Sequence, residues 1–414
     1  MIQRTIWPSL ISHLDAPTIT LLVGPRQSGK TTLLRLIQQY LEKHTHRPVL
    51  FFNLDVTDDE RHFTSQTALL HRVELEFGQG NPGVVIIDEI QRLPDAGRFL
   101  KGIYDQNLPY KLIVSGSGSL ELKEKIGESL AGRKRLFELY TISIQEFIDY
   151  KTAYKYTGNL KKWATLEPEK ARLLLLEYLN YGGYPAVITS STNQDKKLII
   201  REIQESYLIK DIVGLLNLER GDSFRLMLSL IASRIGQLTN ISSLANEIGI
   251  TSETLKRYLW YAEKTYIIKR IAPFFTNPGK ELLKSPHYYF IDMGFRNFLL
   301  QQTGLLSQTS QIGMVFQNFV WLLLQRHFAD SFVDIHHWRS KDQAEVDFIV
   351  KIGLSVLPVE VKAGNLSAPK ISRSLHSFLK TYAPSEAWLI HTGDSFNHQI
   401  GNTLVCFKSW KEFL

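Results

Sequence analysis

Short apolar segments alternate with longer segments of helical period over the first third of the chain. The apolar segments cover residues 19–23, 49–55, 84–89 and 111–115. After the first of them, residues 33–41 carry leucine and isoleucine at helical spacing. Parallel strands need a crossover helix between them, so this alternation predicts a parallel sheet covered by helices. We therefore expect an α/β domain at the amino end of the chain.

The next region, up to about residue 225, is helical in pattern and mixed in charge. Apolar residues at 173–179 and 199–216 predict a small helical lid that packs beside the first domain. Residues 238–249 and 252–264 then predict two short helices joined by a turn that contains Gly249. Two helices joined in this way form a helix-turn-helix.

A pair of strands is expected directly after the helix-turn-helix. Residues 266–275 and 286–291 are rich in aromatic and β-branched side chains, and a turn sequence, Asn-Pro-Gly-Lys at 277–280, lies between them. A helix-turn-helix followed by a strand pair is a winged helix, which we place at residues 226–295.

The last region returns to a mixed pattern. It predicts an apolar helix, three strands, a second helix and a further strand, at residues 313–327, 332–338, 345–351, 355–362, 372–382 and 387–390. This order resembles the restriction-endonuclease-like fold. The expected architecture is therefore a multidomain α/β chain with a parallel-sheet domain at 1–150, a helical lid at 151–225, the winged helix at 226–295 and a domain of this last fold at 296–414.

Composition narrows the class of protein. A chain of 414 residues is too long for one hydrophobic core, and its 44% hydrophobic and 21% charged content is that of a globular protein. The single cysteine, Cys406, excludes an internal disulfide and a cysteine-built zinc site, which suits the reducing cytoplasm. No stretch reaches the length of a membrane span. The net charge of +7 favours anionic partners, nucleic acid first.

Candidate chemistry begins at the end of the first predicted strand. The nine residues there fit the phosphate-loop pattern of two glycines, a lysine and a hydroxyl residue: Gly24, Pro25, Arg26, Gln27, Ser28, Gly29, Lys30, Thr31 and Thr32. The glycines allow a tight loop whose backbone N–H groups converge on phosphate oxygens. Lys30 would reach the terminal phosphates and Thr31 would ligate Mg²⁺. This predicts ATP with Mg²⁺ as the bound cofactors.

Two adjacent carboxylates end the apolar strand at 84–89, and the segment resembles a Walker B element. Asp88 would hold Mg²⁺ through water, and Glu89 would orient and activate the attacking water. The alternative is a strand capped by a solvated acidic turn.

These segments together resemble a prokaryotic family of AAA+ type ATPases whose second region is a domain of unknown function. The resemblance rests on Gly-Pro-Arg-Gln-Ser-Gly-Lys-Thr-Thr at 24–32, Ile-Ile-Asp-Glu-Ile-Gln at 86–91, Leu-Ala-Gly-Arg at 130–133 and Tyr-Gly-Gly-Tyr-Pro at 181–185. It extends over almost the whole chain and implies an ATPase without naming a biological task.

The resemblance also implies roles for residues outside the loop. AAA+ proteins carry a polar sensor at the end of the strand beside Walker B, which points to Ser115, with Ser117 as second choice. Arg133 is a candidate arginine finger for a neighbouring subunit, which implies a homo-oligomer; the alternative is a basic cluster with Lys134 and Arg135 that faces solvent or DNA.

Cations accompany the predicted winged helix. Lys256 and Arg257 on the second helix, with Lys280 and Lys284 at the wing, are the expected DNA phosphate contacts. A winged helix that serves packing or binds a protein partner is the alternative.

The predicted nuclease-like region contains a second acidic constellation. Asp347 followed by Glu360-Val-Lys362 looks like the PD-(D/E)XK motif, in which the two carboxylates bind Mg²⁺ and the lysine helps to orient the hydrolytic water. The chain has Gln317 where members of the family tend to have glutamate. An active nuclease and a retired site kept for binding or packing both remain open.

The function expected from these features is Mg²⁺-dependent ATP hydrolysis coupled to DNA binding or remodelling. The alternative class is a nucleotide-dependent conformational switch or scaffold that binds a protein partner. A motor that processes DNA and a switch differ in whether DNA stimulates turnover.

Overall fold

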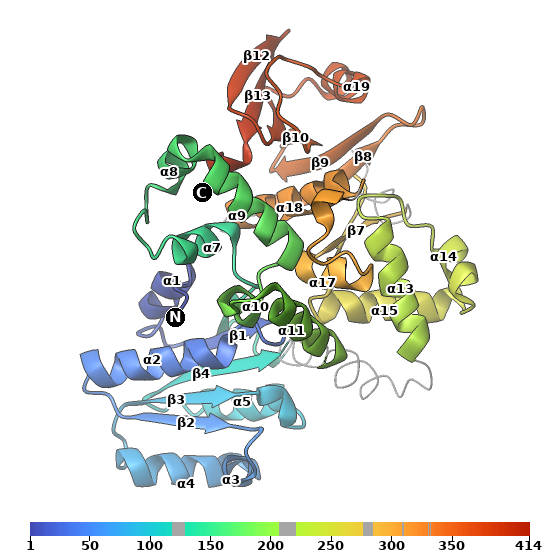
Figure 1. Cartoon of the computed structure of the whole chain (residues 1–414). Helices are drawn as coiled ribbons and strands as arrows, with labels where there is room; N and C mark the ends of the chain where they lie inside the picture. Colours follow the sequence, from blue (N-terminus) through green and yellow to red (C-terminus); the bar gives the residue numbers. More distant parts are fainter. Residues whose placement is uncertain (118–128, 207–220, 276–284, 309, 330, 332) are drawn as a thin grey trace. The chain divides into compact units, whose positions relative to one another are not determined.

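The computed structural model describes residues 1–117, 129–206, 221–275, 285–308, 310–329, 331 and 333–414 (Figure 1). These residues form two compact units. The first contains Met1–Ile142 and Lys264–Tyr266, and the second contains Ser143–Glu263 and Ile267–Leu414.

The first unit is built on a parallel sheet. Its strands are β1 (Ile19–Gly24), β2 (Val49–Asn53), β3 (Gly83–Asp88), β4 (Tyr110–Ser117) and β5 (Lys134–Glu138), in the order β2-β3-β4-β1-β5. Every paired neighbour runs parallel. The predicted parallel sheet is confirmed for β1 to β4, whereas β5 was not predicted from the sequence. The carboxyl ends of the strands lie along one edge.

Helices connect these strands and cover the sheet (Figure 1). They are α1 (Trp7–Ser12), α2 (Lys30–His44), α3 (Thr57–Glu60), α4 (Gln66–Phe77) and α5 (Ala96–Tyr104). The predicted apolar stripe on α2 packs onto the sheet, since Leu33, Leu34, Ile37 and Leu41 are all buried in one cluster with β1 and β3 side chains. Burial of this stripe places the first turn of α2 at the carboxyl end of β1.

The second unit begins with helices. These are α7 (Ile144–Lys151), α8 (Leu160–Leu166), α9 (Pro168–Tyr181), α10 (Pro185–Thr189), α11 (Asn193–Ser206) and α13 (Gly221–Ser233). Ser143 and Glu146 form a capping box at the start of α7. The region predicted as a lid is thus mostly helical where it is described, although its status as a separate domain stays a prediction.

The expected helix-turn-helix elements follow. They are α14 (Ile241–Ile248) and α15 (Ser252–Lys264), then the antiparallel pair β6 (Ile268–Ile271) and β7 (His287–Phe290), then α17 (Met293–Leu299). Gly249 ends α14 with a left-handed φ of 78°, and the Thr251 hydroxyl accepts the Thr254 N–H at 3.1 Å. The elements have the predicted order, and their assignment as a winged helix stays a prediction.

The chain ends in a six-stranded mixed sheet, drawn in orange and red in Figure 1. After α18 (Ile312–His327) come β8 (Val333–Arg339), β9 (Glu345–Ile352), β10 (Ser355–Lys362), α19 (Arg373–Tyr382), β11 (Glu386–His391), β12 (Phe396–Ile400) and β13 (Thr403–Ser409). The order is β12-β13-β11-β10-β9-β8, with β8, β9 and β10 antiparallel and β11 parallel to β10. The sequence interpretation missed β12 and β13.

The buried carboxylate of Asp292 joins the Tyr-Gly-Gly-Tyr-Pro segment at 181–185 to the first turn of α17. Asp292, 3% exposed, accepts the Gly183 N–H at 2.7 Å and the Phe295 N–H at 3.0 Å. A Cβ at Gly182 would lie 2.1 Å from the Asp292 Oδ1 atom. The Tyr-Gly-Gly-Tyr-Pro segment therefore needs glycine because the turn packs directly against this buried carboxylate.

Asn318 joins α18 to β7 in a similar way. Its side chain is fully buried, donates to the Phe290 carbonyl at 2.8 Å and accepts the Phe290 N–H at 2.7 Å. Both backbone groups of Phe290 thus depend on one amide.

Replacement of that amide tests its contribution to stability. We expect Asn318→Leu to lower the free energy of unfolding by about 2–5 kcal/mol, because two buried backbone groups lose their partner. Urea unfolding followed by tryptophan fluorescence measures the change. Gln325→Leu, at a more exposed position of the same helix, is the control and should change stability by less than about 1 kcal/mol. Equal effects of the two substitutions would contradict this account.

Candidate functional site

The loop between β1 and α2 has the shape that the phosphate-loop pattern predicts. A Cβ at Gly24 would lie 2.1 Å from the Leu139 carbonyl oxygen, so the close approach of these two backbones requires glycine. Gly29 precedes α2 with a left-handed φ of 95°. The two glycines thus bend the chain from the strand into the helix over five residues.

Lys30, the first residue of α2, lies under this loop. Its side chain is 4% exposed, and its ammonium donates to the carbonyls of Gly24 at 3.1 Å and Pro25 at 2.7 Å. The positive charge therefore sits at the helix N-terminus, where the backbone N–H groups also favour an anion.

Asp88 lies at the centre of the site. It ends β3, is fully buried, and its Oδ2 atom accepts the Thr31 hydroxyl at 2.6 Å. Its Oδ1 atom accepts the Ser115 hydroxyl and the Glu89 N–H, the latter at 3.1 Å. The structure thus brings together four residues that the sequence interpretation chose separately from a helix and two strands.

The oxygen atoms gathered here suit Mg²⁺. A hydroxyl oxygen and a carboxylate are hard ligands of the kind this ion takes from proteins, with water completing its coordination. Thr31 and Asp88 are already in mutual hydrogen-bond contact, so both oxygens are available at one place. The donor set therefore fits the predicted ion.

Glu89 has an unusual backbone. Its φ of 58° and ψ of 40° are left-handed, a region that non-glycine residues seldom adopt. Its carboxylate accepts a hydrogen bond from the Gln91 amide. Burial raises the pKa of Glu89, while the Gln91 hydrogen bond and the Lys30 charge lower it. Sequence reasoning missed Gln91, although its place two residues after the acid was visible.

A second residue missed by the sequence interpretation supports the loop. The Arg4 guanidinium donates to the Ser28 carbonyl at 3.0 Å and to the Tyr140 carbonyl at 2.6 Å. It thereby connects the phosphate loop to the segment after β5. No pattern near Arg4 indicates this role, because the contact spans 24 and 136 residues of sequence.

Arg133 lies away from this site. Its carbonyl accepts the N–H of Ile19, the first residue of β1, whereas the loop follows the last residue of that strand. The two ends of β1 are roughly 17 Å apart. The Arg133 guanidinium pairs with Asp105 at 2.7 Å. Arg133 therefore cannot act on the loop of its own chain.

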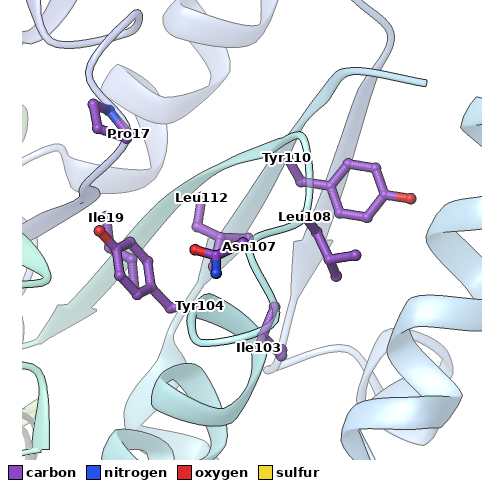
Figure 2. Close-up of a pocket in the computed structure, with 8 residues that line it drawn as sticks. All are labelled: Pro17, Ile19, Ile103, Tyr104, Asn107, Leu108, Tyr110 and Leu112. Carbon is purple, nitrogen blue, oxygen red and sulfur yellow. The ribbon is translucent and has the colours of Figure 1, made fainter. Parts of the chain in front are cut away.

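The first unit also has a pocket of about 220 Å³, whose lining residues are shown in Figure 2. Its lining includes Ile19 and Tyr110, the first residues of β1 and β4, together with Tyr104 at the end of α5. The pocket is therefore at the amino ends of the strands, opposite the phosphate loop, and is separate from the candidate nucleotide site.

The predicted acidic residues of the C-terminal region also meet. Asp347 on β9 and Glu360 on β10 occupy neighbouring strands, and the Lys362 ammonium lies 2.7 Å from the Glu360 carboxylate. Burial raises the pKa of Asp347 to about 7, against the lowering effect of a hydrogen bond from the Val361 N–H. In the described part of the chain, no three histidine, cysteine or acidic residues gather as a metal cluster.

The predicted DNA contacts are only partly described. Lys256 and Arg257 are exposed on α15. Lys280 and Lys284 lie outside the described residues. The structure thus places two of the four cations on a solvent-facing side of the helix.

Three family models match successive parts of the chain. Residues 16–148 match an AAA domain, residues 172–306 match a domain of unknown function (DUF8612), and residues 312–410 match another (DUF4143). The first match covers the parallel sheet and the Asp88 cluster. Residues 16–148 therefore form an AAA-type domain with a phosphate loop.

The chain is also similar to proteins from distant organisms. An uncharacterized protein of Mycobacterium tuberculosis is 26% identical over 92% of this chain and 78% of its own length. One of Methanocaldococcus jannaschii is 26% identical over 84% of this chain and 75% of its own length.

Among the described helices, none is long and apolar enough to cross a bilayer.

Two solved structures are similar at low scores. One is Cdc6p from Pyrobaculum aerophilum, with a TM-score of 0.29 and 10% identity, and the match covers 71% of this chain and 91% of that one. The other is the replication initiator DnaA bound to AMPPCP and single-stranded DNA, with a TM-score of 0.31 and 12% identity, and the match covers 64% of this chain and 90% of that one. TM-scores this low do not establish a common fold.

The loop lysine offers a direct test of nucleotide binding. Lys30→Ala should weaken ATP binding by about tenfold or more, because an ammonium that can pair with phosphate is removed. Titration with a fluorescent ATP analogue measures the affinity. Lys43→Ala, in the last turn of the same helix, removes one positive charge far from the loop and should bind as the parent does. Unchanged affinity in Lys30→Ala would place the nucleotide elsewhere.

Proposed function

We propose that this protein hydrolyses ATP with Mg²⁺ at the AAA domain and couples that turnover to DNA binding or remodelling. The observation that supports ATP hydrolysis is the Asp88 cluster, in which one buried carboxylate accepts hydrogen bonds from Thr31, Ser115 and the Glu89 backbone. A buried carboxylate surrounded by hydroxyl groups next to a phosphate loop suits phosphoryl transfer.

The residues have separable roles in this proposal. The loop N–H groups and Lys30 bind the phosphates and neutralise charge that develops on them. Thr31 and Asp88 would hold Mg²⁺, which supplies electrostatic stabilisation of the transferred phosphoryl group when bound. Glu89 orients the attacking water and accepts its proton, and Ser115, held by Asp88, reports on the terminal phosphate.

Arg133 would complete the site of a neighbouring copy. Its position at the opposite edge of the sheet, with its ion pair to Asp105, supports a role in trans and opposes one in its own chain. A homo-oligomer is part of this proposal.

Coupling to DNA rests on charge and on the helix-turn-helix elements. The chain has a net charge of +7, and Lys256 with Arg257 are exposed on the second helix of that motif, where phosphate contacts are made in such proteins. The competing proposal is a nucleotide-dependent switch that uses this helix to bind a protein partner. The two differ in whether DNA changes the rate of ATP hydrolysis.

The general base has its own test. Glu89→Gln should retain ATP binding and lower the hydrolysis rate by about a hundredfold or more, since the amide cannot accept the proton of water. Steady-state phosphate release, with binding measured in parallel, checks both halves. Normal turnover in this variant would remove Glu89 from the mechanism.

DNA stimulation decides between the two couplings. We expect single-stranded, duplex or branched DNA to raise ATP turnover, and the rise to weaken as salt increases because phosphate contacts release counterions. The Glu89→Gln variant serves as the blank. Lys256→Ala with Arg257→Ala should reduce stimulation and leave basal turnover intact. Turnover indifferent to every DNA form would favour the protein-partner switch.

The Gln91 contact predicts a change in pH dependence. Gln91→Leu removes a hydrogen bond to the charged form of Glu89 while burial remains, so the pKa of Glu89 rises further. The base must be ionised to act, and the acidic limb of the pH–rate profile should therefore move to higher pH, which lowers turnover on that limb. Gln106→Leu, at an exposed position after α5, is the control. An unmoved acidic limb would contradict this role.

A further inference from the structure

The two acidic side chains of the C-terminal sheet have no free carboxylate oxygen. Asp347 accepts the Gln317 amide N–H on Oδ1 at 2.8 Å and the Val361 N–H on Oδ2 at 2.7 Å. Glu360 pairs with Lys362 through Oε1 at 2.7 Å and accepts the Ser372 hydroxyl on Oε2 at 2.8 Å. All four oxygens are therefore engaged by groups of this chain.

Gln317 is the group that decides the chemistry at Asp347. Its Nε2 atom donates to the Tyr289 hydroxyl at 3.1 Å as well as to Asp347. A Cβ at Gly236 would lie 2.5 Å from the Gln317 Oε1 atom, so the amide oxygen packs closely against the Gly236 backbone on the other side. An amide nitrogen has no lone pair for a metal ion, and it faces the oxygen that a metal would need.

The Tyr289 hydroxyl, which also accepts from Gln317, belongs to a packed aromatic side chain. Tyr289, which is fully buried, packs against Trp321 and Phe348 with ring centroids 5.8 Å and 5.3 Å apart. Mg²⁺ gives up its water reluctantly and usually keeps several molecules of it. The two N–H donors on Asp347 therefore do not fit the ion that the fold resemblance implies.

The same contacts connect several elements of the second unit. Gln317 lies on α18, Tyr289 on β7 and Asp347 on β9, and the fourth residue, Val361, lies on β10. Next to Gln317, Asn318 binds both backbone groups of Phe290. The helix is thus fixed to β7 by two consecutive side chains and to the C-terminal sheet by one.

We infer that Asp347 and Glu360 belong to a closed hydrogen-bonded junction and not to a Mg²⁺ site, and that Gln317 is the residue that closes it. The junction joins the strand pair after the helix-turn-helix to the C-terminal sheet. This inference is independent of ATP hydrolysis at the AAA domain.

The inference has a gain-of-function consequence. Gln317→Glu replaces the N–H donor with an oxygen that faces the Asp347 carboxylate. Two carboxylates so close together repel each other unless a cation or a proton lies between them. The substitution should therefore create a divalent-cation site that the parent protein lacks.

Titration with Mn²⁺, followed by the electron paramagnetic resonance signal of the free ion, tests this on the full chain without nucleotide. The proteins compared are the parent, Asp347→Asn, Gln317→Glu and the double variant that carries both of these substitutions. Gln325→Glu makes the same charge change on the same helix and is the matched control. Mn²⁺ bound at the AAA domain is common to all five and cancels in the comparison.

We expect the parent and Asp347→Asn to bind equal amounts of Mn²⁺, and Gln317→Glu to bind one further equivalent that the double variant loses. A parent that binds one equivalent more than Asp347→Asn would overturn the inference. That comparison needs no substitution at position 317, so it stands even if Gln317→Glu fails to fold. A folded Gln317→Glu, judged by circular dichroism, that gains no Mn²⁺ would also overturn the role given to Gln317.

Discussion

The buried carboxylate of Asp88 is the constraint on which the arrangement of the AAA domain depends. A fully buried charge is costly unless hydrogen bonds satisfy it, and here the donors come from the first turn of α2, from β4 and from the next backbone N–H. These donors meet only if β3, β4 and β1 lie side by side and parallel, as the order of the sheet provides. The phosphate loop is then held against the same carboxylate by the start of α2.

The two acidic clusters of this chain differ in the chemistry of their donors. Asp88 is met by the hydroxyls of Thr31 and Ser115, and a hydroxyl oxygen that donates a hydrogen bond retains lone pairs with which it can ligate a metal. Asp347 is met by two N–H groups, which have no such capacity. Asp88 thus suits a metal site and Asp347 does not, although both are carboxylates on strands, because the atoms that donate to them differ.

Much of the architecture follows from local patterns. Strands β1 to β4, α2 with its buried stripe, the helix-turn-helix elements and the order from α18 to β11 lie close to their predicted ranges, because apolar periodicity and turn residues act over a few neighbours. Strand β5 was not predicted. Strand β12 was missed since it is mostly exposed and short of apolar residues, and β13 was missed although it is mostly buried. The sequence also indicated that Gln317 would oppose metal binding, although not which atom it would contact.

The sequence by itself determined which residues could bind phosphate and where most of the strands and helices lie, because glycine, lysine and hydroxyl residues at fixed spacing and apolar periodicity have local consequences. Only the tertiary structure decided which of those residues meet. Strand register brought Ser115 to Asp88 and separated Arg133 from the loop, and packing of distant segments gave Arg4 its contact with Ser28 and Gln317 its contact with Asp347. Contacts of this kind join residues tens to more than a hundred positions apart, and no short pattern in the chain encodes them.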